Sequence, residues 1–194
     1  MTTLAFNAEE IAARELKPSL YELDGISRAT VEAHYKLYQG YVNKRNEILG
    51  KLDGVDLSSA NQVYSDLRSL KVDLTFAIGG IKNHEIYFEH LGGTGGEPAG
   101  VFGDLVRRDF GSAASWKDDL KATGLAGRGW AWTAYDFDEG RLLTTSATPR
   151  TASRCGTRRR SWRSTCTSMR TSSTLRPTAA PTSRRSSTTS ITTL

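Results

Sequence analysis

The fold is decided by residues 79–93, which read GGIKNHEIYFEHLGG. His84 lies inside an apolar run with helical spacing, and an aromatic pair follows three and four residues later. The double glycine Gly92-Gly93 predicts the end of this helix. The pair Gly79-Gly80 costs a helix about 1 kcal/mol per glycine relative to alanine, so it indicates close packing against another backbone or a ligand site.

A second amphipathic run precedes this one. Ser27 is a suitable N-cap, and apolar or aromatic residues then recur at helical spacings as far as Gly50. His34 lies on that face, where it is either a core or interface histidine or a partner of His84. The later helix is predicted over residues 57–91. Two long helices joined by a short loop form an antiparallel hairpin, in which the two histidines can face each other.

The chain beyond the hairpin predicts a second, mixed unit. Residues 94–98 read as a linker, and residues 99–110 and 112–123 as two short amphipathic helices. Residues 129–137 (GWAWTAYDF) are rich in aromatics and alternate, which is typical of a strand, and a turn leads to a return strand from Arg141. The expected fold class is α+β: a helical hairpin with an N-terminal arm packed on its first helix, then an α/β domain with a small antiparallel sheet.

The composition of the chain changes at about residue 143. Residues 1–143 hold all 21 acidic residues and carry a net charge of −5, whereas residues 144–194 carry +10, with 10 Arg, no Lys and 26 Ser or Thr. The predicted domains are therefore 1–93, 94–143 and an aberrant segment 144–194. The first residues lack a signal-peptide pattern and no apolar run could span a membrane, so a cytoplasmic location without a membrane partner is expected.

In this order, the features resemble the iron/manganese superoxide dismutases over residues 15–143. The motifs that carry the resemblance are GGIKNH at residues 79–84, with Phe88, and GWAW at residues 129–132. In that family one histidine from each long helix holds the metal, together with an aspartate and a histidine from a downstream D-V-x-E-H-A-Y segment. The resemblance thus implies His34 and His84 as metal ligands, superoxide as substrate, and a homodimer or tetramer.

The resemblance also implies roles for the residues around the metal. Tyr41 resembles the gateway tyrosine that assists proton delivery, and Trp130 and Trp132 resemble the aromatic wall of the site. The family usually places this tyrosine eight residues after the ligand histidine, whereas His34 and Tyr41 are seven apart, and a gapless alignment would put Ala33 in the ligand place. Seven residues are two helical turns on one face, which favours His34.

The expected metal is manganese or iron. Neutral imidazoles and a carboxylate suit both oxidation states of either metal. Gly80, four residues before His84, resembles the manganese-type pattern and favours manganese. His90, six residues after His84, falls on another face of the helix and is expected at the surface or an interface.

Three interpretations compete for residues 144–194. The composition suits a disordered basic tail, an RNA-binding arm, or a translation shifted by one nucleotide in a GC-rich gene. The third interpretation, a shifted reading frame, predicts a specific peptide that can be compared with the sequence. The family-like peptide Asp-Val-Tyr-Glu-His-Ala-Tyr, encoded GAC GTG TAC GAG CAT GCG TAC T, reads Thr-Cys-Thr-Ser-Met-Arg-Thr one nucleotide later, which is the sequence of residues 165–171.

A shifted frame has a chemical consequence. Thr165 would stand where the ligand aspartate belongs and Met169 where the last ligand histidine belongs. A hydroxyl and a thioether are poor ligands for manganese or iron. We therefore expect a superoxide dismutase whose activity is impaired in the chain as written. The alternative is a helical interaction module whose basic tail binds RNA or acidic partners, although the tail has no lysine and Trp162 is its single aromatic residue, unlike typical nucleic-acid arms.

Overall fold

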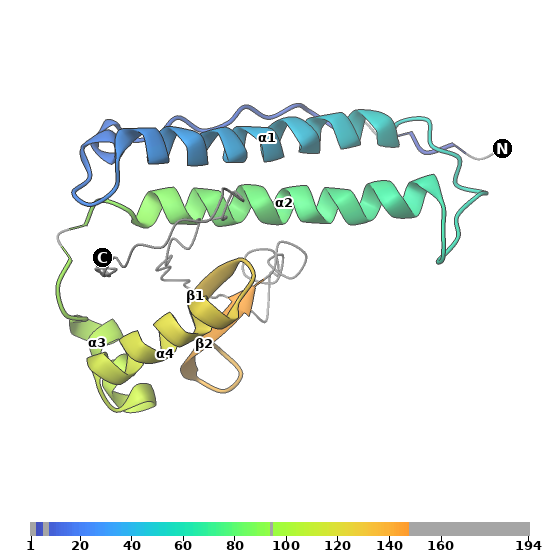
Figure 1. Cartoon of the computed structure of the whole chain (residues 1–194). Helices are drawn as coiled ribbons and strands as arrows, with labels where there is room; N and C mark the ends of the chain where they lie inside the picture. Colours follow the sequence, from blue (N-terminus) through green and yellow to red (C-terminus); the bar gives the residue numbers. More distant parts are fainter. Residues whose placement is uncertain (1–2, 6–7, 94, 148–194) are drawn as a thin grey trace, which may run out of the picture.

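Two long antiparallel helices form the first part of the structure (Figure 1). The computed structural model describes residues 3–5, 8–93 and 95–147, so the predicted disorder of the tail beyond residue 147 lies outside the described residues. Helix α1 spans Arg28–Leu52, and the hydroxyl of its N-cap Ser27 accepts a hydrogen bond from the backbone N–H of Thr30. The predicted cap is confirmed, and the helix ends two residues beyond the predicted Gly50.

Helix α2 spans Asp66–His90, so its predicted start near residue 57 is wrong. The side chain of Asp56 accepts hydrogen bonds from the N–H and hydroxyl of Ser58, and that of Asn61 accepts from the N–H groups of Val63 and Tyr64. Such side-chain turns compete with helical hydrogen bonds. The helix begins only after its N-cap Ser65, whose hydroxyl accepts from the N–H of Arg68, so the two helices are joined by a longer loop than predicted.

The N-terminal segment, residues 8–25, runs along α1 as predicted (Figure 1). Asn46 of α1 bonds both the N–H and the carbonyl of Ile11, and Arg45 donates to the carbonyl of Glu9. A short 3₁₀ helix, η1, spans Pro18–Glu22 and buries Leu20 completely. The hydrogen bonds fix the segment along α1.

The second part holds two helices and a two-stranded sheet. Helix α3 spans Gly100–Phe110 and α4 spans Ala113–Ala126; strands β1 (Trp130–Asp136) and β2 (Arg141–Ala147) pair antiparallel. The α+β fold class and the hairpin turn are confirmed. The predicted stop of α4 at Gly124 is wrong, because the helix continues to Ala126 and the N–H of Gly127 caps it on the carbonyl of Thr123.

Strand β2 also crosses the expected boundary between residues 143 and 144. Thr144 pairs with Thr133, and the register continues to Ala147 opposite Trp130. The ladder is made by backbone groups, so it does not require the side chains of family-like residues. The first four residues of the aberrant segment are therefore part of the sheet.

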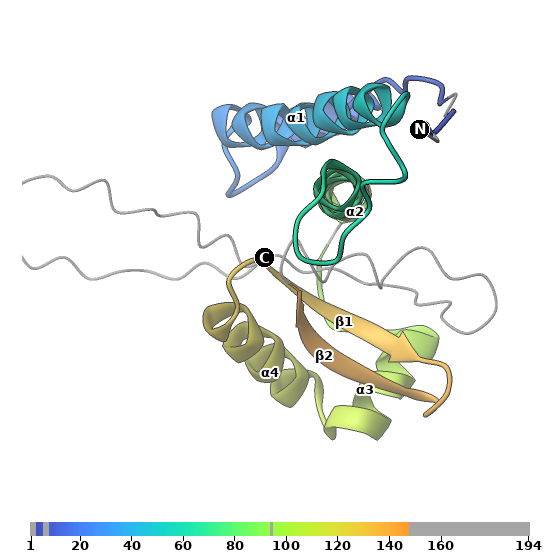
Figure 2. The ribbon, with the colours of Figure 1, turned by 90° about the vertical axis from the view of Figure 1, so that its right-hand side faces the viewer.

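The two parts meet where β1 faces the helical hairpin. Figure 2 shows α2 between α1 and the sheet, with α4 beside the strands. One core cluster combines Val31, Tyr38 and Val42 of α1, Ile81, Tyr87 and Phe88 of α2, and Trp130 and Trp132 of β1. Burial of this shared apolar surface holds the parts together. Among the helices that the structure describes, none combines the length and apolarity needed to cross a bilayer.

Candidate metal site

His34 and His84 meet across the seam between α1 and α2. Their ring centroids are 4.8 Å apart and the ring planes are inclined at 75°. The two residues are only 8% and 4% exposed. Helical periodicity explains the meeting, because each histidine lies on the apolar face of its helix and the helices are antiparallel. Ala33, the other candidate for the first position, is exposed on α1.

The backbone of α2 fixes the proton on the His84 ring. Nδ1 of His84 lies 2.6 Å from the carbonyl oxygen of Gly80, one helical turn earlier. A carbonyl only accepts, so Nδ1 carries the hydrogen and the lone pair of the neutral imidazole is on Nε2. This arrangement is typical of metal-binding histidines, whose second ring nitrogen is commonly hydrogen-bonded to the protein.

Tyr41 lies against both Gly80 and His84. Its ring centroid is 5.3 Å from that of His84. A Cβ atom added to Gly80 would approach the Tyr41 ring to 2.4–2.6 Å, closer than any real contact, so only glycine fits there. The glycine pair predicted close packing against another backbone or a ligand site; at Gly80 the packing is close, but the neighbour is the side chain of Tyr41. Burial raises the pKa of the Tyr41 phenol. Helix α1 is regular throughout, so the seven-residue spacing places His34 and Tyr41 on one face without a bulge.

Trp130 of β1 packs against the histidine pair. Its ring centroid lies 5.1 Å from that of His84 and 6.3 Å from that of His34, and Trp132 stacks behind it at 5.3 Å. Both tryptophans are buried, and the indole N–H of Trp132 has no hydrogen-bond partner among the residues that the structure describes. A wall of this kind excludes water and strengthens electrostatic interactions at the site.

Two tyrosines near the histidines were not assigned a role from the sequence. Tyr87 lies 4.9 Å from His34 between ring centroids, and Tyr38 lies 6.3 Å from His84. Tyr87 follows His84 by three residues and Tyr38 follows His34 by four, so helical spacing could have placed both beside the pair. His90 is exposed, as expected, and its Nδ1 lies 2.7 Å from the carbonyl oxygen of Ile86.

The described residues supply two nitrogen donors. No group of three or more His, Cys, Asp or Glu side chains suited to a metal occurs among residues 3–5, 8–93 and 95–147. The fixed tautomer of His84 and the adjacent buried imidazole of His34 fit one half of a manganese or iron site. The predicted positions of the other two ligands, 165 and 169, lie outside the described residues.

Several known proteins with similar sequences are named as superoxide dismutases. Residues 15–92 match the alpha-hairpin domain of iron/manganese superoxide dismutases. The iron superoxide dismutase of Aquifex aeolicus is 42% identical over 133 residues, which cover 66% of this chain and 62% of that protein. The iron superoxide dismutase of Cupriavidus metallidurans is 35% identical over 136 residues, covering 66% and 68%. The manganese superoxide dismutase of Corynebacterium diphtheriae is 41% identical over 78 residues, covering 39% of each chain.

The matches cover only part of each protein. The chain spans less than two thirds of the length of its Aquifex relative, and 66% of this chain is matched. Three observations support one family: the match to the hairpin domain, the two relatives matched over about two thirds of the chain, and the pair of histidines on separate helices. The chain belongs to the iron/manganese superoxide dismutase family.

Proposed function

We propose that the site around His34 and His84 is built for superoxide dismutation. In this reaction one superoxide is oxidised to oxygen, and a second takes up an electron and two protons to become hydrogen peroxide. The observation that carries the proposal is the contact of two buried imidazoles from separate helices, 4.8 Å apart between ring centroids, under the wall formed by Trp130. The relatives named as superoxide dismutases support it.

The metal of the proposal is manganese or iron, held by His34 and His84. When bound, either metal supplies a one-electron carrier that alternates between two oxidation states. The Gly80 pattern favours manganese, whereas the Aquifex and Cupriavidus relatives are named for iron and the Corynebacterium relative for manganese. Both metals therefore stay in the proposal.

The surrounding residues have roles that follow from their contacts. The Gly80 carbonyl holds the Nδ1 proton of His84 and so directs Nε2 as the donor. Tyr41 rests on His84. The ordinary pKa of a phenol already lies well above neutral pH and burial raises it further, so the hydroxyl is protonated there and can donate a hydrogen bond or a proton to the site. Trp130 and Trp132 limit the entry of water.

The proposal includes impaired activity in the chain as written. Two of the four protein ligands implied by the family pattern fall at Thr165 and Met169, whose side chains suit neither metal. Two imidazoles alone leave most of the coordination sphere to solvent, so metal binding should be weak. The competing hypothesis, an interaction module with a basic tail, depends on the segment 144–194, of which only residues 144–147 are described.

The test is to purify the full chain and to measure its metal content and its rate of superoxide dismutation. The chain as written should hold well below stoichiometric manganese or iron and dismutate weakly. Full metal occupancy with high activity would refute the impairment. A His84→Ala variant separates binding at this site from adventitious binding, because only the former is lost.

The assembly and the cellular location of the protein are also proposed. We infer a homodimer or tetramer by analogy with the family pattern, and we keep the cytoplasmic location expected from the sequence pattern. Light scattering on the purified chain measures the assembly, and cell fractionation measures the location. A monomer at micromolar concentration would contradict the first expectation, and recovery outside the cytoplasm would contradict the second.

A further inference from the structure

We propose that Tyr38 and Glu85, joined to Arg14 of the N-terminal segment, are positioning residues for the imidazole of His84. This inference rests on the proposed function, because it assigns residues that hold one of the two imidazoles in place. The three residues come from three separate parts of the chain: the N-terminal segment, α1 and α2. Together they are called the polar link below.

Tyr38 contacts His84 with its ring and the polar link with its hydroxyl. The residue is 2% exposed, and its ring lies nearly parallel to that of His84, with centroids 6.3 Å apart and planes inclined at 27°. The hydroxyl accepts a hydrogen bond from the backbone N–H of Arg14 at 3.0 Å and donates to Oε1 of Glu85 at 3.3 Å. A ring with its hydroxyl held at two points cannot slide along His84 without breaking one of two partly buried hydrogen bonds.

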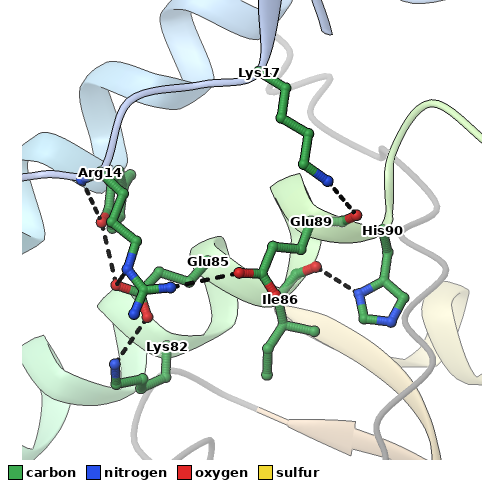
Figure 3. Close-up of polar contacts among 8 residues, drawn as sticks. Arg14, Lys17, Lys82, Glu85, Ile86, Glu89 and His90 are labelled. Carbon is green, nitrogen blue, oxygen red and sulfur yellow. Dashed lines mark hydrogen bonds and ion pairs between the residues drawn. The ribbon is translucent and has the colours of Figure 1, made fainter. Parts of the chain in front are cut away.

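Glu85 is the residue that ties this hydroxyl to α2. It follows His84 directly in the sequence, and its side chain is only 10% exposed. Nε of Arg14 lies 3.4 Å from one carboxylate oxygen and Nζ of Lys82 lies 2.8 Å from the other. Figure 3 shows Arg14 pointing from the N-terminal segment onto Glu85, with Lys82 on the opposite side of the carboxylate. A carboxylate that is nearly buried needs such partners, so its position is well determined.

The same region offers matched controls. Tyr35, three residues before Tyr38, donates its hydroxyl to the carbonyl of Arg14 at 3.1 Å, but its aromatic neighbours are Tyr38 and Phe88. Glu89 also pairs with Arg14, at 3.4 Å, but its side chain is 60% exposed (Figure 3). Removing either group loosens the N-terminal segment by one contact without altering the contact on His84.

The experiment follows the imidazoles of the full chain by ¹H–¹⁵N correlation and titrates the chain with Co²⁺. The chain has three histidines, so the exposed His90 serves as an internal reference for the other two. Tyr38→Phe should move the His84 ring signals and weaken Co²⁺ binding by about 10-fold or more, the usual effect of losing a partner outside the ligand set. Tyr35→Phe should leave the His84 ring signals in place and change the Co²⁺ affinity by less than about twofold. Circular dichroism checks that the Tyr38→Phe and Tyr35→Phe variants fold.

A second pair of variants keeps the inference testable if Tyr38→Phe does not fold. Glu85→Gln retains an acceptor for the tyrosine hydroxyl but loses the ion pairs, so it should give a smaller change of the same kind, and Glu89→Gln should give none. Identical His84 signals in Tyr38→Phe and Tyr35→Phe would overturn the inference. Shifted His84 signals in a chain that binds no Co²⁺ would support the positioning role and show that the two imidazoles alone do not retain a metal ion.

Discussion

The rings of His34 and His84 touch edge to face, with centroids 4.8 Å apart, although 50 residues separate them in the sequence. The contact depends on the antiparallel register of α1 and α2. Beside it, the ring of Tyr41 packs on His84 and fills the space where a side chain at Gly80 would lie. Several measurable properties follow from this arrangement.

Gly80→Ala should destabilise the protein although alanine is the better helix former. The new methyl would lie 2.4–2.6 Å from the Tyr41 ring, so the ring must move off His84. Overpacking of this kind costs about 1–3 kcal/mol, which exceeds the gain of about 1 kcal/mol in helix propensity. Urea unfolding monitored by circular dichroism measures the difference.

Gly40→Ala is the matched control, one residue before Tyr41 on the same helix. A Cβ at Gly40 meets nothing within 4 Å, so this variant should be more stable by about 0.5–1 kcal/mol. If both glycine variants gain stability, the account of Gly80 is wrong.

Ser65→Ala should destabilise the start of α2. The Ser65 side chain accepts from the N–H of Arg68 and is largely buried, so its loss leaves a helix donor without a partner. The expected cost is about 1 kcal/mol in the free energy of unfolding. Ser59→Ala removes an exposed loop hydrogen bond to Asp56 and should change stability by less than about 0.5 kcal/mol. Equal effects would mean that the helix does not begin at Ser65.

Asp109→Asn should reduce stability in a pH-dependent way. The Asp109 carboxylate, 7% exposed, bonds Arg108 and accepts from the N–H of Leu142 at 2.6 Å, which ties α3 to β2. The hydrogen bond from Arg108 is the main reason that the pKa of this carboxyl lies below its ordinary value. A lowered pKa stabilises the fold above the unfolded value of about 4, and this stabilisation disappears as pH falls through the folded value.

At pH 7 the Asp109→Asn variant should therefore lose about 1.5–3 kcal/mol, and the difference from the parent should shrink as the pH falls below about 4. Asp104→Asn, at a carboxylate 71% exposed, is the control and should stay within about 0.5 kcal/mol. A difference for Asp109→Asn that is constant between pH 7 and pH 3 would contradict the charge-based explanation.

The sequence predicted those features that depend on local pattern. Ser27 as a cap, the stop at Gly92, the strand around Trp130 and the histidine pair all follow from spacing and residue type. The start of α2 was missed because Asp56 and Asn61 form side-chain turns that no periodicity reports.

The contacts of the N-terminal segment could not be predicted in detail. The hydrogen bond from the Arg14 backbone to Tyr38 joins residues 24 apart, and the bond from Tyr38 to Glu85 joins residues 47 apart. The spacing of hydrophobic residues predicts neither hydrogen bond, because the partners are polar groups that come together only when the N-terminal segment, α1 and α2 pack. The roles of His34, His84 and Tyr41 in metal chemistry likewise stay predictions that need the measurements above.

The most direct test restores the reading frame after the codon for Leu143 and compares the metal content of the new chain with that of the chain as written. We expect stoichiometric manganese or iron and rapid superoxide dismutation in the restored chain, loss of both in its His84→Ala variant, and little of either in the chain as written. Full metal occupancy of the chain as written, or a restored chain that binds no metal, would contradict the account of a site divided between the described helices and a lost C-terminal half.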